Sequence, residues 1–215
     1  MPFDVARVVR GFDADIVVVP ETYRDEDGRC ILDPLRDEYH VETLELMRLA
    51  LRTDLSARRD LVPRVGAWEL AVCSRFPVRD VHVITLGHIG SDPATPRQCL
   101  ALTIDVDGTD VEMIGLHTSS HLHVFAPIRH LLGLKRQLPV RGPQIIAGDY
   151  NWWGPPVHAL MPGWQRPVRG RTWPAHRPHS QIDHVLVRGG IECISGEVLG
   201  QTPSDHRPVR ARLRL

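Results

Sequence analysis

The sequence is nearly without lysine. Lys135 is the only lysine among 26 lysine and arginine residues, and 26 acidic residues balance them to a formal net charge of zero. A balanced chain has no strong overall field to attract nucleic acid. Arginine binds phosphate in a bidentate way better than lysine does, but a genome-wide composition bias explains the same excess more simply. Composition therefore leaves the partner open.

Paired cysteines and long apolar runs are also missing. The four cysteines form no C-x-x-C pair, so neither a zinc site nor a disulfide framework is implied; they are Cys30, Cys73, Cys99 and Cys193. We find no signal peptide and no apolar run long enough to span a membrane. We therefore expect a cytoplasmic protein with no membrane segment. Nothing in the sequence indicates its oligomeric state.

What is present is typical of one globular domain spanning residues 1–215, with 42% hydrophobic and 24% charged residues. Periodicity and turn residues predict helices over residues 3–12, 40–55, 127–138 and 155–160. They predict strands over 16–19, 66–74, 81–86, 97–106, 110–117, 145–147, 181–187, 191–199 and 207–214, with a hairpin turn at Asp107-Gly108. Residues 22–40 and 162–180 are expected to form loops. Many strands with few helices indicate two packed sheets with helices outside.

Polar side chains follow the central apolar run Ile145-Ile146-Ala147. Gly148 ends this run, and Asp149 and Asn151 come directly after it. Residues two apart on an extended chain point the same way, so both side chains can reach one phosphate oxygen or one metal-bound water. Gly, Asp and Asn are also ordinary turn residues, so a G-D-x-N motif is weak evidence on its own.

Four further motifs stand at the edges of predicted strands. Two carry an acid and a histidine: Gln181-Ile182-Asp183-His184 and Ser204-Asp205-His206-Arg207-Pro208. The other two are Val19-Pro20-Glu21 and the run from Ile114 to Thr118 that contains His117. Together with Gly148-Asp149-Tyr150-Asn151, this ordered set resembles the endonuclease/exonuclease/phosphatase superfamily of DNase-I-like phosphoesterases. The resemblance covers the chain from about Asp15 to its end.

This resemblance implies a four-layer α/β sandwich with the active site at one end of the sheets. It also implies that Glu21, with Asp205 nearby, holds Mg²⁺ or Mn²⁺, a role that suits oxygen ligands. Asp183 would pair with His206, fixing its tautomer and raising its basicity.

The remaining site residues follow from the chemistry of phosphoester hydrolysis, which needs an activated water and shielding of the phosphate charge. Asp149 can orient or deprotonate the water, and Asn151 can hydrogen-bond a phosphate oxygen. The resemblance implies that His117 is the second histidine of the site, donating to the phosphate or to the leaving group. The general base is left open.

Simpler roles exist for several of these residues. Asp183 can cap a turn, and His206 can be a satisfied strand-end histidine. His121 and His123 are interpreted as loop histidines rather than metal ligands. Arg97 opens the predicted hairpin and could face the site, but we favour an ordinary strand-edge arginine. Three tryptophans are expected to flank the site, where they either stack on bases or anchor loops; these are Trp152, Trp153 and Trp173.

One part of the resemblance fails. Family members begin with a strand that ends in an asparagine, whereas Met1 directly precedes the first predicted helix here. Either the start of the protein is assigned too late, or the fold is short of its first strand. Our hypothesis is a metal-dependent phosphodiesterase, leaning towards a nuclease, with a phosphodiester such as nucleic acid as substrate. The alternatives are a small-molecule or lipid phosphodiesterase or phosphatase, and a weakened relative that binds a phosphorylated ligand.

Overall fold

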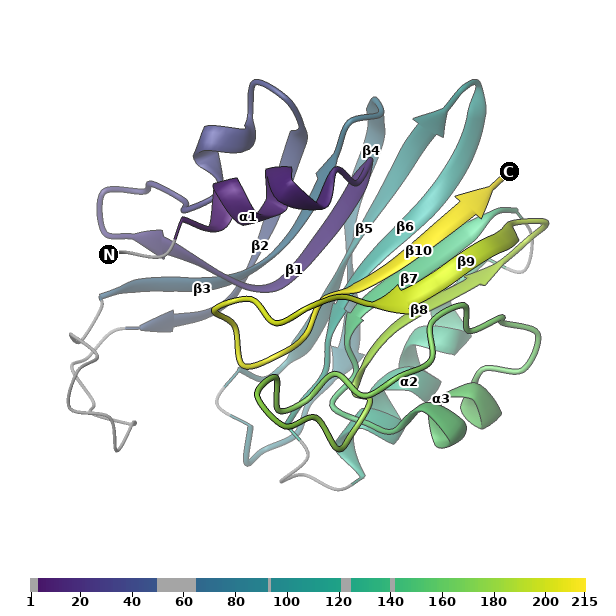
Figure 1. Ribbon diagram of the computed structural model, residues 1–215. Coiled ribbons are helices and arrows are strands. Elements are labelled where there is room, and N and C mark those ends of the chain that lie inside the picture. Colours follow the sequence, from purple (N-terminus) through teal and green to yellow (C-terminus); the bar gives the residue numbers. More distant parts are fainter. Residues whose placement is uncertain (1–3, 50–64, 93, 121–124, 140–141) are drawn as a thin grey trace.

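The computed structural model describes residues 4–49, 65–92, 94–120, 125–139 and 142–215 (Figure 1). The helices are α1 (Val5–Phe12), α2 (Ala126–Gln137) and α3 (Gly154–Leu160), and a 3-10 turn covers Asp33–Leu35. The strands are β1 (Ile16–Asp25), β2 (His40–Leu49), β3 (Gly66–Ser74), β4 (Val78–Gly87), β5 (Arg97–Val106), β6 (Thr109–His117), β7 (Gln144–Asp149), β8 (Asp183–Arg188), β9 (Glu192–Val198) and β10 (Val209–Arg214).

These strands form three sheets. A three-stranded antiparallel sheet has the order β1-β3-β2, and a separate hairpin pairs β9 with β10. The largest sheet has the order β4-β5-β6-β7-β8 and is antiparallel except between β6 and β7. The parallel pair matters for function, because β6 and β7 both end at the same edge of the sheet.

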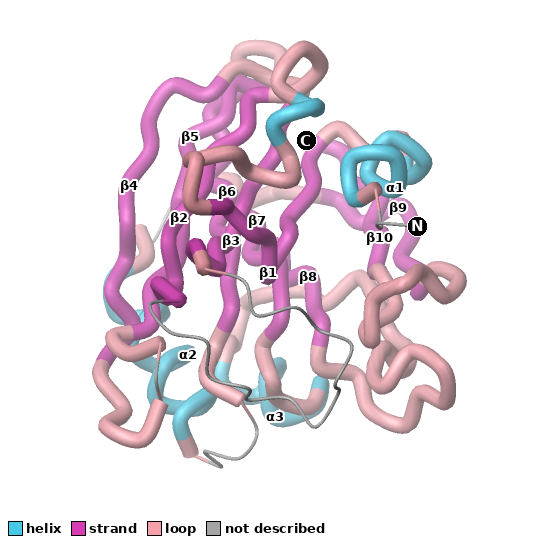
Figure 2. Tube along the Cα trace, turned by 90° about the vertical axis from the view of Figure 1, so that its left-hand side faces the viewer, coloured by secondary structure: helices cyan, strands magenta, loops and turns pink. Residues whose placement is uncertain are grey.

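The sheets and helices stack in four layers. Leu70 and Val72 of β3 pack against Leu100 and Leu102 of β5, which joins the two larger sheets face to face. The β9–β10 hairpin packs on the same face of the five-stranded sheet, over β7 and β8. Helix α1 covers the outer face of the three-stranded sheet, while α2 and α3 cover that of the five-stranded sheet (Figures 1 and 2). The predicted four-layer α/β sandwich is confirmed.

The layer that contains β1 and β10 is interrupted between these two strands. Within the described residues, β1 pairs only with β3 and β10 pairs only with β9. Ile16 and Val18 of β1 lie over Ile145 and Ala147 of β7, and residues of β10 lie over the same pair. The described chain therefore supplies no strand to the open edges of β1 and β10.

The predicted hairpin between β5 and β6 is confirmed. Asp107 and Gly108 have φ of 51° and 87°, the left-handed pair that a tight two-residue hairpin needs. The pairing runs from Leu100 opposite Gly115 to Val106 opposite Thr109.

The helix predicted over residues 40–55 is wrong. Residues 40–49 form β2, which pairs with β3 from His40 opposite Ser74 to Leu49 opposite Gly66. A register shift between Glu45 and Met47 interrupts the alternation of the strand. The apolar residues on either side of this bulge therefore have the spacing of a helix. Residues 50–55 lie outside the described residues.

The first strand was predicted to end at Pro20-Glu21, which is also wrong. Strand β1 continues to Asp25 through a register shift between Val19 and Thr22. Proline is tolerated at such a bulge because its missing N–H removes no regular ladder bond there. The expected loop therefore begins only after Asp25.

None of the described helices is long and apolar enough to cross a membrane.

Candidate active site

Three neighbouring strands of the five-stranded sheet bring their polar end residues to one edge. In the register, His117 at the end of β6 is opposite Asp149 at the end of β7. Asp149 is in turn opposite Asp183, the first residue of β8. All three side chains are buried or nearly so, and His117 Nε2 lies 3.7 Å from Asp149 Oδ2. Backbone pairing therefore assembles the centre of the site.

A glycine makes this close approach of β6 and β7 possible. Gly148 has φ of 143°, and a Cβ atom there would lie 1.9 Å from the carbonyl oxygen of Leu116. The Gly before Asp149 is therefore required by the backbone, in addition to being a turn residue.

Asn151 is held in a left-handed conformation, with φ of 47°. Its backbone N–H donates to Asp149 Oδ1 at 2.7 Å, and its side-chain Nδ2 donates to Asp149 Oδ2 at 3.3 Å and to the Thr118 carbonyl at 3.2 Å. Asparagine adopts this backbone conformation more readily than most residues. Asn151 thus fixes both carboxylate oxygens of Asp149.

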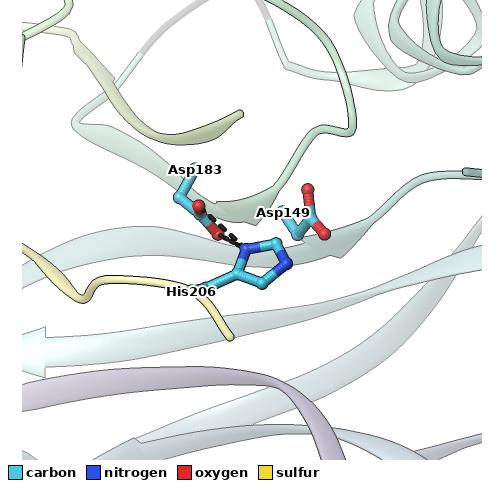
Figure 3. A group of neighbouring side chains, drawn as sticks. All are labelled: Asp149, Asp183 and His206. Carbon is cyan, nitrogen blue, oxygen red and sulfur yellow. Dashed lines mark hydrogen bonds and ion pairs between the residues drawn. The ribbon is translucent and has the colours of Figure 1, made fainter. Parts of the chain in front are cut away.

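His206 reaches the same point from the segment that precedes β10. Its Nδ1 atom lies 3.1 and 3.0 Å from the two carboxylate oxygens of Asp183 (Figure 3). The other ring nitrogen faces away from Asp183. Ligand atoms of Asp149, Asp183 and His206 all lie within 4.8 Å of one another. The imidazole is therefore oriented by Asp183 with one nitrogen left for a reactant.

The glutamate from β1 completes the arrangement on the side of His117. Glu21 Oε1 lies 3.8 Å from His117 Nε2, and its side chain is 59% exposed. Partial burial and then repulsion from Asp205 raise the pKa of Glu21, while the charges of His206 and Arg97 act in the opposite direction. Asp205 is exposed and lies next to His206 in the chain.

The site has an excess of negative charge. Burial, followed by repulsion from Asp183, raises the pKa of Asp149 to about 8 despite the opposing charge of His206. Burial by itself lowers the pKa of an imidazole, but the hydrogen bond and charge of Asp183 outweigh it and raise the pKa of His206 to about 9. Both groups therefore hold a proton more tightly than they would in water.

His117 has the opposite environment. Burial, and then the positive charges of Arg97 and His206, lower its pKa to about 3. The ring is therefore neutral near pH 7 and can offer one N–H without a positive charge.

The residue types present fit a hard divalent cation. Glu21, Asp149 and Asp205 offer carboxylate oxygens, which Mg²⁺ and Mn²⁺ prefer. Raised carboxyl pKa values are what a cation would relieve, because added positive charge favours the ionised form.

Sequence reasoning missed a buried ion pair behind His117. The Nε and Nη2 atoms of Arg97 donate to the two oxygens of Asp92 at 2.7 and 3.2 Å, and Ser119 Oγ also donates to Asp92. Both charged side chains are almost fully buried, at 10% and 2% exposure. Arg97 was interpreted as an ordinary strand-edge arginine, which is wrong. Only its position at the start of the hairpin hinted otherwise.

The other candidates are placed as follows. Trp153 is 56% exposed beside the Asn151 loop, whereas Trp152 is half-buried against the core. Trp173 is half-buried, and its ring lies edge-on to His179 with centroids 5.3 Å apart. His121 and His123 lie outside the described residues. Tyr150, which no motif singled out, is fully buried and packs against His184.

A known protein family matches most of the chain. The sequence profile of the Endonuclease/Exonuclease/phosphatase family matches residues 3–206. The chain belongs to this family. Members of the family are generally hydrolases of phosphoesters. A search of curated proteins found no match.

Solved structures share the fold of this family member at low sequence identity. One is an endonuclease/exonuclease/phosphatase from Beutenbergia cavernae DSM 12333, with a TM-score of 0.76 and 23% identity, covering 98% of this chain and 65% of that chain. Another is the mannosyl-6-phosphatase Bt3783 of Bacteroides thetaiotaomicron VPI-5482, with a TM-score of 0.70, 17% identity and coverage of 98% and 89%. A humanized TDP2 from D. rerio with 14 mutations has a TM-score of 0.69, 14% identity and coverage of 98% and 90%. The chain thus spans just under two thirds of the Beutenbergia protein.

Proposed function

We propose that the protein is a divalent-metal-dependent phosphodiesterase of the nuclease type. The observation that carries the proposal is the oriented His206–Asp183 pair, which has ligand atoms of Asp149 within 4.8 Å. His117 lies 3.7 Å from Asp149, and Glu21 lies 3.8 Å from His117. A nucleophile, its base and a site for the leaving group need this kind of convergence.

Glu21 and Asp205 are the residues that would hold the cation, one from β1 and one from the segment that precedes β10. When bound, the cation would neutralise phosphate charge and favour the ionised form of the nearby acids. Mg²⁺ and Mn²⁺ both suit these oxygen donors.

Hydrolysis needs a water whose oxygen forms a bond to phosphorus while the bond from phosphorus to the leaving oxygen breaks. One proton must leave the water, and one must reach the leaving group. Either Asp149 or His206, once it has lost its own proton, can take the proton from the water, and the one that stays protonated can give a proton to the leaving group. Asp149 is locked by Asn151, and His206 is oriented by Asp183, so each has a fixed direction.

The neutral His117 and the amide of Asn151 would act on the phosphate itself. His117 carries no positive charge near pH 7, so it would donate a hydrogen bond to a phosphate or leaving oxygen as a neutral imidazole. Asn151 has its Nδ2 in contact with Asp149 and Thr118, which supports a positioning role for this residue.

The test is hydrolysis of bis-p-nitrophenyl phosphate in Mg²⁺ or Mn²⁺, with nicking of a plasmid followed in parallel. We expect metal-dependent hydrolysis that EDTA abolishes. His206→Ala should lower kcat by at least about 100-fold, the usual size of a general acid–base contribution. Asp183→Asn should also lower kcat, because the imidazole loses its charged partner.

Arg136→Gln is a matched surface control, because Arg136 is exposed on α2. Its rate should equal that of the unmodified protein. If the folded protein hydrolyses neither substrate in either metal, or if EDTA leaves the rate unchanged, the proposal is wrong. Hydrolysis of p-nitrophenyl phosphate alone would instead indicate a phosphomonoesterase.

A further inference from the structure

Charge is distributed unevenly along a chain that is neutral overall. Between Asp149 and Asp183 there are four arginines and three histidines, but no acidic residue and no lysine. The four arginines, Arg166, Arg169, Arg171 and Arg177, all lie in residues 162–180, which we name the arginine loop. A genome-wide preference for arginine does not explain the absence of acids from this stretch.

The arginine loop is fixed against the strands that carry the site. Gln165 pairs with Val187 of β8, and Gly170 packs on Val198 of β9. At its far end, the Ala175 N–H donates to the carbonyl of Asp205, and the Arg207 N–H donates to the carbonyl of Thr172. Figure 1 shows the green loop against the yellow segment that leads into β10. The loop therefore runs from β8 and β9 to the residue before His206.

The same loop holds Asp183 in place. Thr172 Oγ1 accepts hydrogen bonds from the backbone N–H groups of Ile182 and Asp183, at 3.2 and 3.3 Å. The segment that bears the arginines is thus bonded to the backbone of the residue that orients His206.

Three of the arginines are exposed and have no acidic partner. Arg169, Arg171 and Arg177 form no ion pair with any described residue, whereas some exposed arginines elsewhere, such as Arg48 and Arg79, do. A guanidinium that is free of carboxylates is available to a phosphate.

Arg166 shows that the loop lacks a compensating anion. Its Nη1 atom is buried and has no hydrogen-bond partner. Burial, and then the charge of Arg169, lower the pKa of Arg166, so its nearest strong electrostatic neighbour is another cation. This region therefore has a positive potential beside a site built to act on phosphate.

Aromatic side chains accompany the arginines. Trp153 is 56% exposed on the loop that follows β7, and Trp173 lies within the arginine loop next to His179. An exposed aromatic ring such as that of Trp153, beside a positively charged surface, is typical of proteins that bind single-stranded nucleic acid through backbone contacts and base stacking.

We propose that the arginine loop binds a nucleic acid strand, with Arg169, Arg171 and Arg177 contacting phosphates that flank the scissile phosphodiester. This proposal rests on the proposed phosphodiesterase function and names the substrate as an oligonucleotide. A small phosphodiester has a single phosphate and does not need three separate arginines. An anionic membrane is less suited, because the exposed residues of the loop are Arg, His, Gln, Gly and Pro, with no aliphatic side chain to insert.

The test compares the unmodified protein with the triple variant Arg169→Gln, Arg171→Gln and Arg177→Gln on two substrates. On a single-stranded oligonucleotide, we expect KM to rise by about ten-fold or more with kcat nearly unchanged. Each lost phosphate contact should reduce the slope of log affinity against log salt by about 0.7. On bis-p-nitrophenyl phosphate, which has no flanking phosphate, both constants should stay within about two-fold.

The matched control changes three exposed arginines elsewhere, Arg7→Gln, Arg29→Gln and Arg136→Gln, for the same loss of charge. It should leave KM and the salt slope for the oligonucleotide unchanged. If the loop variant keeps the oligonucleotide KM and salt slope while still hydrolysing the small substrate, the inference is wrong and the proposed function stands. If both triple variants weaken binding equally, net charge rather than the loop is responsible, and the inference is also wrong.

Binding without turnover separates this inference from the proposed function. Fluorescence anisotropy of a labelled oligonucleotide in EDTA should show weaker binding by the loop variant, whether or not the protein hydrolyses anything. Sedimentation with phosphatidylglycerol vesicles is the competing measurement. Loop-dependent binding to vesicles, without loop-dependent binding to the oligonucleotide, would replace the nucleic acid with a membrane surface.

Discussion

At the scale of single residues, Asp149 and His206 bind protons more tightly in the folded protein than in the unfolded chain, and this difference affects folding stability. The pKa of Asp149 is raised to about 8 and that of His206 to about 9, both above the values of an unfolded chain. Between pH 7 and 8 the folded protein therefore binds more protons at these groups than the unfolded protein does. A raised folded pKa gives stability at low pH that is lost as the pH rises through that pKa.

We therefore expect the melting temperature of the protein in EDTA to fall between pH 7 and pH 8. We choose this pH range because the buried His117, His130 and His184 contribute little to it. Their pKa values are lowered to about 3 or 4 in the folded protein, and in the unfolded chain they titrate nearer pH 6.5. Asp149→Asn removes one of the two groups, so its melting temperature should depend less on pH. An equal dependence in both proteins, measured by differential scanning fluorimetry, would contradict these assignments.

The ion pair between Arg97 and Asp92 makes a second prediction at this scale. Removing one partner of a buried pair leaves an uncompensated charge and typically costs about 3–5 kcal/mol. Asp92→Ala should therefore lower the free energy of unfolding by about this amount in urea denaturation. Arg97→Met combined with Asp92→Leu removes both charges and should cost less.

The same pair also has a pH dependence of known sign. Burial opposes ionisation of Asp92, but hydrogen bonds from Arg97 and Ser119 outweigh it and lower its pKa to about 2. Its contribution to stability is present above pH 4 and is lost as the pH falls towards 2. The double variant Arg97→Met with Asp92→Leu tests the cause of the stability loss predicted for Asp92→Ala. If the double variant is less stable than Asp92→Ala, the loss in Asp92→Ala does not arise from an unpaired arginine.

At the scale of elements, the sequence is most informative where local pattern and tertiary structure agree. The β5–β6 hairpin follows from Asp107-Gly108 and its flanking apolar runs, because the turn itself dictates the register. Strand β2 could not be found in this way. Its bulge gives apolar residues a helical spacing, and only pairing with β3, whose partner residues lie 17 to 34 positions later in the chain, makes it a strand.

The site residues divide along the same line. Each motif was visible because an acid or histidine stands at the end of an apolar run, and the register of β6, β7 and β8 brings three of them together. Asp92 does not stand at the end of an apolar run. It lies in a loop, and its role depends on contacts with Arg97 and Ser119 from two other segments.

Gly148 provides the prediction that belongs to β7. Because a Cβ atom would lie 1.9 Å from the Leu116 carbonyl, Gly148→Ala must push β6 and β7 apart or distort a strained backbone. We expect a loss of at least about 2 kcal/mol in the free energy of unfolding, together with a fall in activity. Gly11→Ala is the control, since nothing lies within 4 Å of its Cβ position in α1. Circular dichroism melts of the two variants that coincide would show that Gly148 has no steric role.

At the scale of the whole molecule, the site lies where three sheets meet. Glu21 comes from the β1-β3-β2 sheet, Asp149 and Asp183 from the five-stranded sheet, and Asp205 and His206 from the segment that leads into the β9–β10 hairpin. Burial is the main cause of the raised pKa values of Glu21 and Asp149, and repulsion from neighbouring carboxylates adds to it. A bound cation would relieve this repulsion and link the sheets together.

Mg²⁺ should therefore stabilise the fold as well as support catalysis. A ligand that binds only the folded state at 100 times its Kd adds about 2.7 kcal/mol, so saturating Mg²⁺ should raise the melting temperature by several degrees. Glu21→Gln removes a carboxylate from the proposed cation site and should shrink this rise. Glu26→Gln is the matched control, because Glu26 is an exposed glutamate on the turn after β1, and it should respond as the unmodified protein does. If Glu21→Gln and Glu26→Gln show the same rise, Glu21 does not hold the ion, and the cation must bind through Asp149 and its neighbours on the five-stranded sheet.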